Sequence, residues 1–363
     1  MERLSWVLQV CVVACLSTTV FAQWEQCVGT ANLNMQSLLT EGAYNFAGGA
    51  TGAYLSTDQA AHYVTSNTGN DATGPTRGFA KDGTYVYTCT SKGVFRSADH
   101  GATWIARSTG LTNQLTSGIL SVDSYLFVVT PTGVFKSTNH GDTWSSSGLS
   151  SIDVRSIAAI RGVLVAGTNG SGAYRSVDWG STWTACNSGS TSTTYRAMES
   201  DGTTLFAGGQ VGTGVYRSTN LGQSWTLLSG GLPSGSYRGF ASRPGVIVAG
   251  SFGAGVFYSK DDGDHWTALN DGLTDLSIYD LEFNDAYLVV ATNTKGAFRI
   301  PLSVLGLCPS DLDGDGAVGS SDIAFVLLSF GDAAPGDPAD VDGSGSVDAA
   351  DVSLLLLDFG PCA

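Results

Sequence analysis

The feature of this chain that most restricts its fold is a twelve-residue segment that recurs along the sequence. Five clear copies are GVFRSADHGATW (93–104), GVFKSTNHGDTW (133–144), GAYRSVDWGSTW (172–183), GVYRSTNLGQSW (214–225) and GVFYSKDDGDHW (255–266). A degenerate copy, GAYLSTDQAAHY, begins at Gly52, and a truncated copy, GAFRI, begins at Gly296. The leading glycines follow one another at intervals of 41, 40, 39, 42, 41 and 41 residues, so one unit occurs seven times.

Each unit shows the apolar pattern of short β-strands joined by tight turns. The segments LFVVT, VLVAGT, LFAGG, VIVAG and LVVAT predict one strand, and the GVF or GAY segment after each predicts the next. The following turn, Ser-x-Asp/Asn-x-Gly-x-x-Trp, leads into an outer strand. Repeats of about 40 residues with four strands each are the period of a β-propeller. We therefore expect an all-β, seven-bladed β-propeller over residues 23–303.

The seventh unit ends at GAFRIP (296–301) and lacks an outer strand. The segment QWEQC (23–27) is similar to TWTAC (182–186), which is an outer strand in the fourth unit. We therefore predict that residues 23–28 complete the seventh blade, which would close the ring and remove two exposed sheet edges.

The repeated turns resemble the Asp-box (BNR) repeats of sialidases, xyloglucan-degrading propellers, sortilin-type receptors and photosystem II assembly-factor propellers. This resemblance covers residues 23 to about 303 and implies the fold, whereas the activities of these proteins differ. The box residues themselves predict structural roles: Asp or Asn accepts hydrogen bonds from its own turn, Gly permits a positive φ, and Trp is buried.

Two further patterns in the boxes bear on catalysis. All four histidines, His62, His100, His140 and His265, lie in these turns, which leaves none for a Ser-His-Asp triad or a zinc site in the body. FRIP (298–301) has the letters of a sialidase motif, but Arg299 occupies a repeat position also held by a basic residue in four other units. A structural role is therefore the better interpretation of Arg299.

A second basic position recurs 16 to 18 residues before the leading glycine of a unit, where it begins an apolar segment. It holds Arg77, Arg155, Arg196 and Arg238, and in two further units we assign it to Ser117 and Asp280. This segment should be the innermost strand, so the four guanidinium groups would gather at one mouth of the central channel. Arg forks suit carboxylate or phosphate recognition, and we expect an anionic glycan or an acidic peptide as ligand. The alternative is that each Arg pairs with an acid of a neighbouring blade.

The C-terminal part, from Cys308 onward, contains 11 Asp and no Glu, Lys or Arg. The sequence DLDGDGAVGSSD (311–322) is echoed by DVDGSGSVDAAD (340–351), and oxygen donors at this spacing around a glycine are those that wrap Ca²⁺. We expect two Ca²⁺ ions. The predicted ligands are Asp311, Asp313, Asp315, Ala317 and Asp322, then Asp340, Asp342, Ser344, Ser346, Asp348 and Asp351. Val318 and Val347 should point inward and couple the two loops.

Each loop leads into an apolar helix, and the two copies lie 29 residues apart. A duplicated loop and helix without entering helices resembles a type I dockerin, which implies a small α-helical, calcium-binding domain over residues 308–363. The resemblance implies a cohesin-like scaffold protein as partner, with Ser320 and Ser321 at the recognition positions. The second copy has Ala349-Ala350 there, and Leu327 and Leu328 replace the basic residues usual in dockerins.

Residues 1–22 read as a secretory signal peptide, with an apolar run from Trp6 to Cys15 and Ala22 before the cleavage point. No later stretch is long enough to span a membrane, so we expect a secreted protein. In an oxidising compartment Cys308 and Cys362, which bracket the acidic tail, should form a disulfide. Cys27, Cys89 and Cys186 are left unassigned.

Three functions fit these features. We favour a non-catalytic recognition or scaffolding propeller tethered through the dockerin-like domain. The alternative is a glycoside hydrolase in polysaccharide catabolism, with acids drawn from Asp153, Asp275, Asp280 and Glu282; the third is a chaperone-like assembly factor. Nucleic acid is an unsuitable partner, because the formal net charge is −15 and phosphate binding needs a basic face.

Overall fold

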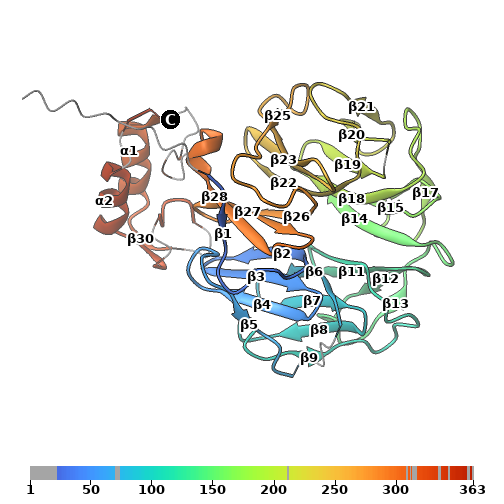
Figure 1. The fold of residues 1–363 in the computed structure, drawn as a ribbon. Helices are drawn as coiled ribbons and strands as arrows, with labels where there is room; N and C mark the ends of the chain where they lie inside the picture. The colour runs from blue at the N-terminus through green and yellow to red at the C-terminus, as the bar shows by residue number, and fades with distance from the viewer. Residues whose placement is uncertain are drawn as a thin grey trace, which may run out of the picture.

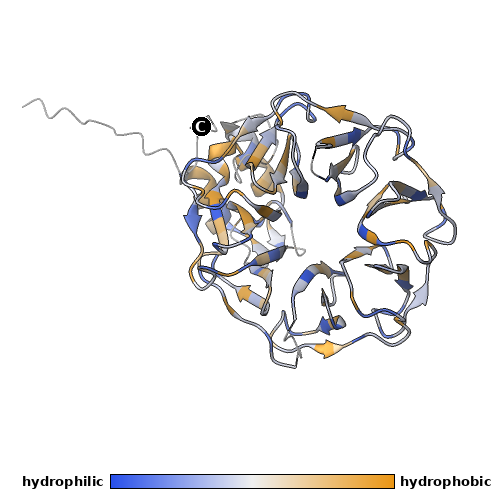
Figure 2. Ribbon diagram, turned by 45° about the vertical axis from the view of Figure 1, so that its right-hand side comes forward, coloured by the Kyte–Doolittle hydropathy of each residue, from blue (hydrophilic) through white to orange (hydrophobic). Residues whose placement is uncertain are grey.

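In the computed structural model, seven four-stranded antiparallel sheets follow one another around a common axis (Figures 1 and 2). The structure describes residues 23–69, 74–210, 212–307, 310, 312, 317–333, 337–341, 344–357 and 360–361. The predicted signal peptide, Cys308 and Cys362 lie outside these residues. The seven sheets confirm the predicted number of blades.

The first strand of each blade contacts the first strands of its neighbours and is therefore innermost. The innermost strands are β2 (Met35–Glu41), β6 (Thr76–Lys81), β10 (Gly118–Val122), β14 (Val154–Ile160), β18 (Tyr195–Ser200), β22 (Tyr237–Arg243) and β26 (Ile278–Phe283). The second strands are β3 (Tyr44–Gly49), β7 (Val86–Thr90), β11 (Tyr125–Thr130), β15 (Val163–Thr168), β19 (Leu205–Gly209), β23 (Val246–Ser251) and β27 (Tyr287–Thr292).

The third strands carry the start of each repeated segment, and the fourth strands are short. The third strands are β4 (Gly52–Ser56), β8 (Gly93–Ser97), β12 (Gly133–Ser137), β16 (Ala173–Ser176), β20 (Val215–Ser218), β24 (Gly255–Ser259) and β28 (Ala297–Pro301). The outer strands are β5 (Val64–Thr65), β9 (Ile105–Ala106), β13 (Ser145–Ser146), β17 (Thr184–Ala185), β21 (Thr226–Leu228), β25 (Thr267–Ala268) and β1 (Glu25–Gln26).

The ring closes through β1, which pairs antiparallel with β28 and gives the seventh sheet the order β1-β28-β27-β26. Trp24 is 5% exposed beside this strand, and its indole Nε1 donates a 2.8 Å hydrogen bond to the carbonyl of Leu269 in the sixth blade. The segment then reaches the first blade, where Val28 and Ala61 share a backbone hydrogen bond of 2.8 Å. These contacts confirm that the segment behind the predicted signal peptide completes the last blade.

The repeated turns hold the blades together as well as folding each hairpin. In the second blade, Asp99 accepts hydrogen bonds from Ser97 Oγ and from the backbone of Thr103, at 2.7 and 2.8 Å. Gly101 lies at φ +83°, and a Cβ there would come within 2.6 Å of the Phe46 ring in the first blade. The box Trp104 is 1% exposed and donates from Nε1 to the carbonyl of Ser66, also in the first blade. The turn therefore serves the interface between blades.

The apolar faces of neighbouring blades form the core. One cluster joins Phe46 of the first blade to Phe79, Phe95 and Trp104 of the second. Equivalent clusters lie between the other blades, because the second and third strands are buried on both faces. None of the helices in the described residues is long and apolar enough to cross a bilayer.

After β28, the 3-10 helix η1 (Leu302–Leu305) leads to a second unit outside the ring of blades (Figure 1). It contains β29 (Ala317–Val318), α1 (Ser320–Leu328), β30 (Gly331–Asp332), β31 (Ser346–Val347), α2 (Ala349–Leu357) and β32 (Gly360–Pro361). Val318, Val326, Val347 and Leu355 share one small core.

The strands of this unit pair differently from our expectation. Val318 and Val347 are buried, as predicted, but β29 pairs with β32 and β31 pairs with β30, so the two loop strands do not pair with each other. Each loop strand instead pairs with the segment that follows the helix of the other copy. The two copies are therefore interlocked through the chain that leaves each helix.

Candidate functional site at the channel mouth

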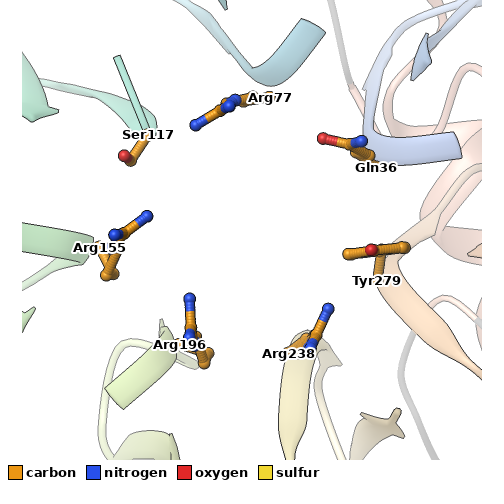
Figure 3. Close-up of a pocket in the computed structure, with 7 residues that line it drawn as sticks. All are labelled: Gln36, Arg77, Ser117, Arg155, Arg196, Arg238 and Tyr279. Atoms are coloured by element: carbon orange, nitrogen blue, oxygen red, sulfur yellow. The ribbon is translucent and has the colours of Figure 1, made fainter. Parts of the chain in front are cut away.

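A cavity of about 270 Å³ lies at one end of the propeller axis and receives one residue from each blade (Figure 3). Its lining residues are Gln36, Arg77, Ser117, Arg155, Arg196, Arg238 and Tyr279. The structure thus brings the four repeated arginines to one place, and we call the four of them the arginine ring.

A β-bulge aims these side chains at the axis. In β14, Val154 pairs with Thr168 and Ser156 pairs with Gly167, which leaves Arg155 as an extra residue without a partner. The same register shift sets Gln36, Arg77, Arg196, Arg238 and Tyr279 apart in their strands. Only Ser117 lacks the shift, because it directly precedes β10. A bulge bends its strand and redirects one side chain, which here is the residue that lines the cavity.

Small residues in the second strands allow the bulges to sit side by side. A Cβ on Gly208 in β19 would meet the carbonyl oxygen of Tyr237 at 2.3 Å, and Tyr237 directly precedes Arg238. A Cβ on Gly167 would come within 2.7 Å of the Cβ of Tyr195, which directly precedes Arg196. The Ala-Gly step near the end of each of these strands therefore lets the next blade approach and places its arginine.

The structure corrects the sequence prediction in the seventh blade. Tyr279, rather than Asp280, lines the cavity, and Gln36 of the first blade was not predicted. The count from the leading glycine fails because hairpin lengths differ between units and the bulge shifts the register by one residue. A large buried residue directly before the lining position, such as Tyr195 or Ile278, is the signal that would have found both.

Only one arginine of the ring has an acidic partner among the described residues. Arg155 Nη2 lies 2.5 Å from Asp153 Oδ2 of its own blade, and Asp153 also accepts a hydrogen bond from Asn169. The guanidinium of Arg238 instead stacks on the Phe252 ring, 3.7 Å from the ring centroid. Arg77 and Arg196 form no ion pair with any residue that the structure describes. Pairing of each Arg with a neighbouring blade is therefore not the general arrangement.

Buried donors in the ring remain without acceptors. The Nε–H groups of Arg155, Arg196 and Arg238 are buried and have no hydrogen-bond partner within the described chain. Burial lowers the pKa of Arg196, and the positive charges of Arg155 and Arg238 lower it further. Arginine nevertheless stays protonated in proteins, so the ring carries repelling charges that an anion would relieve.

Three carboxyl groups lie further along the innermost strands. Burial raises the pKa of Glu199 to about 8, of Asp280 to about 7 and of Glu282 to about 8. Glu199 accepts a hydrogen bond from Ser242 Oγ, and Asp280 accepts one from the backbone of Leu38. Because these pKa values lie at or above 7, the three groups carry much less than three negative charges at neutral pH. They therefore do not neutralise the arginine ring.

The acids considered for glycoside hydrolysis are dispersed. Asp153 is held by Arg155, Asp275 caps the turns of Ser277 and Thr294, and Asp280 and Glu282 belong to the channel group just described. A second cavity of about 420 Å³ lies at the far ends of β18 and β22, and Asp201 and Asp262 both line it. Sequence reasoning missed these two acids, which lie in turns. The Asp201 carboxylate caps its own turn through the backbone amides of Thr203 and Thr204.

The predicted calcium ligands are only partly within the described residues. Asp311, Asp313, Asp315 and Asp342 lie outside them, and Ala317 belongs to β29. Asp322 and Asp351 are 0% exposed in the first turns of α1 and α2. Asp340 accepts hydrogen bonds from the backbone of Ser344 and Gly345, and Asp348 donates its backbone amide to Asp351. The Ser346 carbonyl accepts from Ser344 Oγ.

These donors fit a hard cation, because all are oxygens and two are buried carboxylates at helix starts. Within the described residues, no group of three or more Asp, Glu, His or Cys side chains could hold a metal ion. The predicted partner residues Ser320 and Ser321 are exposed at the start of α1. The pairing of Cys308 with Cys362 falls outside the described residues, in which Cys27, Cys89 and Cys186 are free and buried.

Comparison with solved structures finds many propellers of low sequence identity. The extracellular domain of a protein described as a one component system of B. thetaiotaomicron superposes with a TM-score of 0.64 at 12% identity, covering 77% of this chain and 40% of that chain. YCF48 bound to D1 peptide gives 0.60 at 13% identity, covering 77% and 95%. The GH74 enzyme of Niastella koreensis gives 0.56 at 20% identity, covering 75% and 43%.

These likenesses show the fold: the chain is a seven-bladed β-propeller of the structural class that includes YCF48 and GH74 enzymes. The chain spans about two fifths of the B. thetaiotaomicron and Niastella structures. The sequence matches no protein-family model and no curated protein.

Proposed function

We propose that this chain is an exported recognition protein whose propeller binds an anionic ligand at the arginine ring. The observation that carries the proposal is that four guanidinium groups from four blades line one cavity while only Arg155 is paired with a carboxylate. Leaving charges and N–H donors buried without partners is unfavourable, so such an arrangement is expected where a ligand supplies the acceptors.

The composition of the cavity favours binding over catalysis. No carboxyl, thiol or imidazole group lines it, and the described polar side chains there are those of Gln36, Ser117, Tyr279 and the four arginines. General acid and base groups are thus missing from the lining, whereas bidentate donors for carboxylates are abundant. YCF48, a propeller of nearly the same length, is solved with a bound peptide, which supports a binding role for this architecture.

We further propose that the C-terminal unit is a calcium-dependent, dockerin-like module that tethers the propeller to a cohesin-like scaffold protein. Its support is the paired pattern of acidic loops and helices, together with the buried Asp322 and Asp351 at the helix starts. Bound Ca²⁺ would neutralise the clustered carboxylates, which otherwise repel one another. The propeller would then present its arginine ring outside the cell.

The test is binding of an oligoglutamate peptide and of oligogalacturonate to the full-length chain and to the double variant Arg155→Glu/Arg238→Glu. The double variant should lose binding of whichever ligand the wild-type protein takes. The matched control is Arg161→Glu/Lys260→Glu, which makes the same change in net charge at two exposed side chains outside the cavity. Unchanged affinity in the ring variant would end the proposal.

A glycoside hydrolase is the second candidate, and one observation favours it: Asp201 and Asp262 line the same surface cavity. Two carboxyl groups across a sugar-sized groove are the usual catalytic arrangement of such enzymes. A reducing-sugar assay on a panel of neutral and acidic glycans tests this candidate. Activity that disappears in both Asp201→Asn and Asp262→Asn would establish it.

A further inference from the structure

We infer that the ligand of the channel mouth is a compact polyanion, a small molecule that carries at least three negative charges on carboxylate or phosphate groups. This inference rests on the proposed function and adds the charge and the size of the ligand. It is supported by the balance of charges in the cavity, by the directions of its donors and by its volume.

The charge balance leaves three cations to be neutralised. The cavity receives four guanidinium groups, and Asp153 is the one carboxylate that pairs with any of them in the described chain. A ligand with a single carboxylate would leave two guanidinium groups uncompensated in a partly buried site, which is costly. A ligand with three charges would complete the pairing.

The donors converge from two sides of the axis. Arg155, Arg196 and Arg238 come from consecutive blades and form an arc, and each has a buried Nε–H without an acceptor. Arg77 faces this arc from the other side of the cavity (Figure 3). The charged groups of one ligand must therefore point in several directions, as they do in a tricarboxylate or a short polyphosphate.

The volume sets the size of the part that is bound. A cavity of about 270 Å³ holds about nine water molecules at roughly 30 Å³ each. A small tricarboxylate or a triphosphate fits this space, while a folded protein segment with side chains does not. The neutral edge formed by Gln36 and Tyr279 offers an amide and a phenol for any hydroxyl group of the ligand.

The test is calorimetric titration of the full-length chain with acetate, tricarballylate and triphosphate at a fixed free Ca²⁺ concentration. Fixed Ca²⁺ matters because the polyanions also chelate calcium, which the C-terminal unit is proposed to bind. We expect both polyanions, or the one with the matching chemistry, to bind at least about tenfold more tightly than acetate, since each charge-assisted contact adds affinity. The carboxylate and phosphate arms identify the source of the charge.

Single substitutions then locate the binding. Arg196→Gln should weaken polyanion binding about tenfold or more, and Arg77→Gln, from another blade, is the second variant if the first does not fold. Arg161→Gln, outside the cavity, should bind like the wild type. Equal affinities for acetate and the polyanions, or unchanged polyanion binding in Arg196→Gln and Arg77→Gln, would overturn the inference.

The two levels of the proposal fail separately. If oligoglutamate or oligogalacturonate binds through Arg155 and Arg238 but neither small polyanion binds, the ligand is not compact and the inference is wrong while the proposed function stands. If none of these ligands binds, both are wrong.

Discussion

Arg299 Nη1 donates a 2.9 Å hydrogen bond to the backbone carbonyl of Gln59, which joins the last blade of the propeller to the first. The same contact links other neighbouring blades: Arg96 to His140, Lys136 to Trp179, Arg175 to Leu221 and Arg217 to Asp262. Every acceptor is the residue in the repeated turn that adopts a positive φ, between 54° and 60°. The left-handed residue exposes its carbonyl toward the preceding blade, so the basic repeat position has a structural role.

Removing the Arg299 contact should weaken ring closure. Arg299→Met keeps the aliphatic stem over Tyr287 but loses the hydrogen bond to Gln59 and the ion pair with Glu25. We expect a loss of about 1–3 kcal/mol in the free energy of unfolding, because the donor is charged and the acceptor is a backbone carbonyl. Urea unfolding measures it, with Lys260→Met as the control. A loss equal to that of the control would contradict the closing role.

The indole of Trp24 should matter more than any side chain of β1 itself. Trp24→Ala removes a ring that is 5% exposed in the core between the sixth and seventh blades, together with its hydrogen bond to Leu269. A cost of about 3–5 kcal/mol is expected for truncating a buried Trp. Gln26→Ala, on the exposed strand nearby, should cost far less. Similar unfolding curves for the two variants would show that β1 is not essential to closure.

The channel carboxyl groups predict a decline in stability at alkaline pH. Burial raises the pKa of Glu282 to about 8, so the folded state favours the protonated form. Its stabilising contribution is complete below the unfolded pKa near 4.5 and is lost as the pH rises through 8. The melting temperature should therefore fall between pH 5 and pH 9, and Glu282→Gln should flatten this fall. Asp123→Asn, at an exposed turn, should leave the profile unchanged.

Calcium removal should unfold only the C-terminal unit. A chelator is expected to remove the helical signal of α1 and α2 from the far-UV circular dichroism spectrum, because metal binding and folding are coupled. The last tryptophan of the chain is Trp266, so tryptophan fluorescence reports on the propeller and should not change. Asp322→Asn/Asp351→Asn should resemble the chelated protein. A helical signal that is the same with and without calcium would refute a structural role for the metal.

The repeat made much of the architecture predictable. The number of blades and the closing role of residues 23–28 follow from periodicity, because each unit must pack on a neighbour and the last unit lacks a strand. The gathering of Arg77, Arg155, Arg196 and Arg238 followed from the same reasoning, since equivalent positions in a propeller lie around one axis.

What the sequence did not predict depends on contacts between units. The choice of Tyr279 over Asp280 is set by a bulge, which moves the register by one residue without changing the composition of the strand. The acceptors of the basic repeat positions are backbone carbonyls of the next blade, which carry no side-chain signature. The pairing of β29 with β32 joins segments at opposite ends of the C-terminal unit and leaves no local signal either.

The most direct measurement is a crystal structure of the full-length chain grown with the anion that binds most tightly. Recognition at the channel mouth predicts density on the propeller axis within hydrogen-bond distance of Arg155, Arg196 and Arg238. A ligand bound at another surface, with the arginine ring empty at saturating concentration, would contradict it.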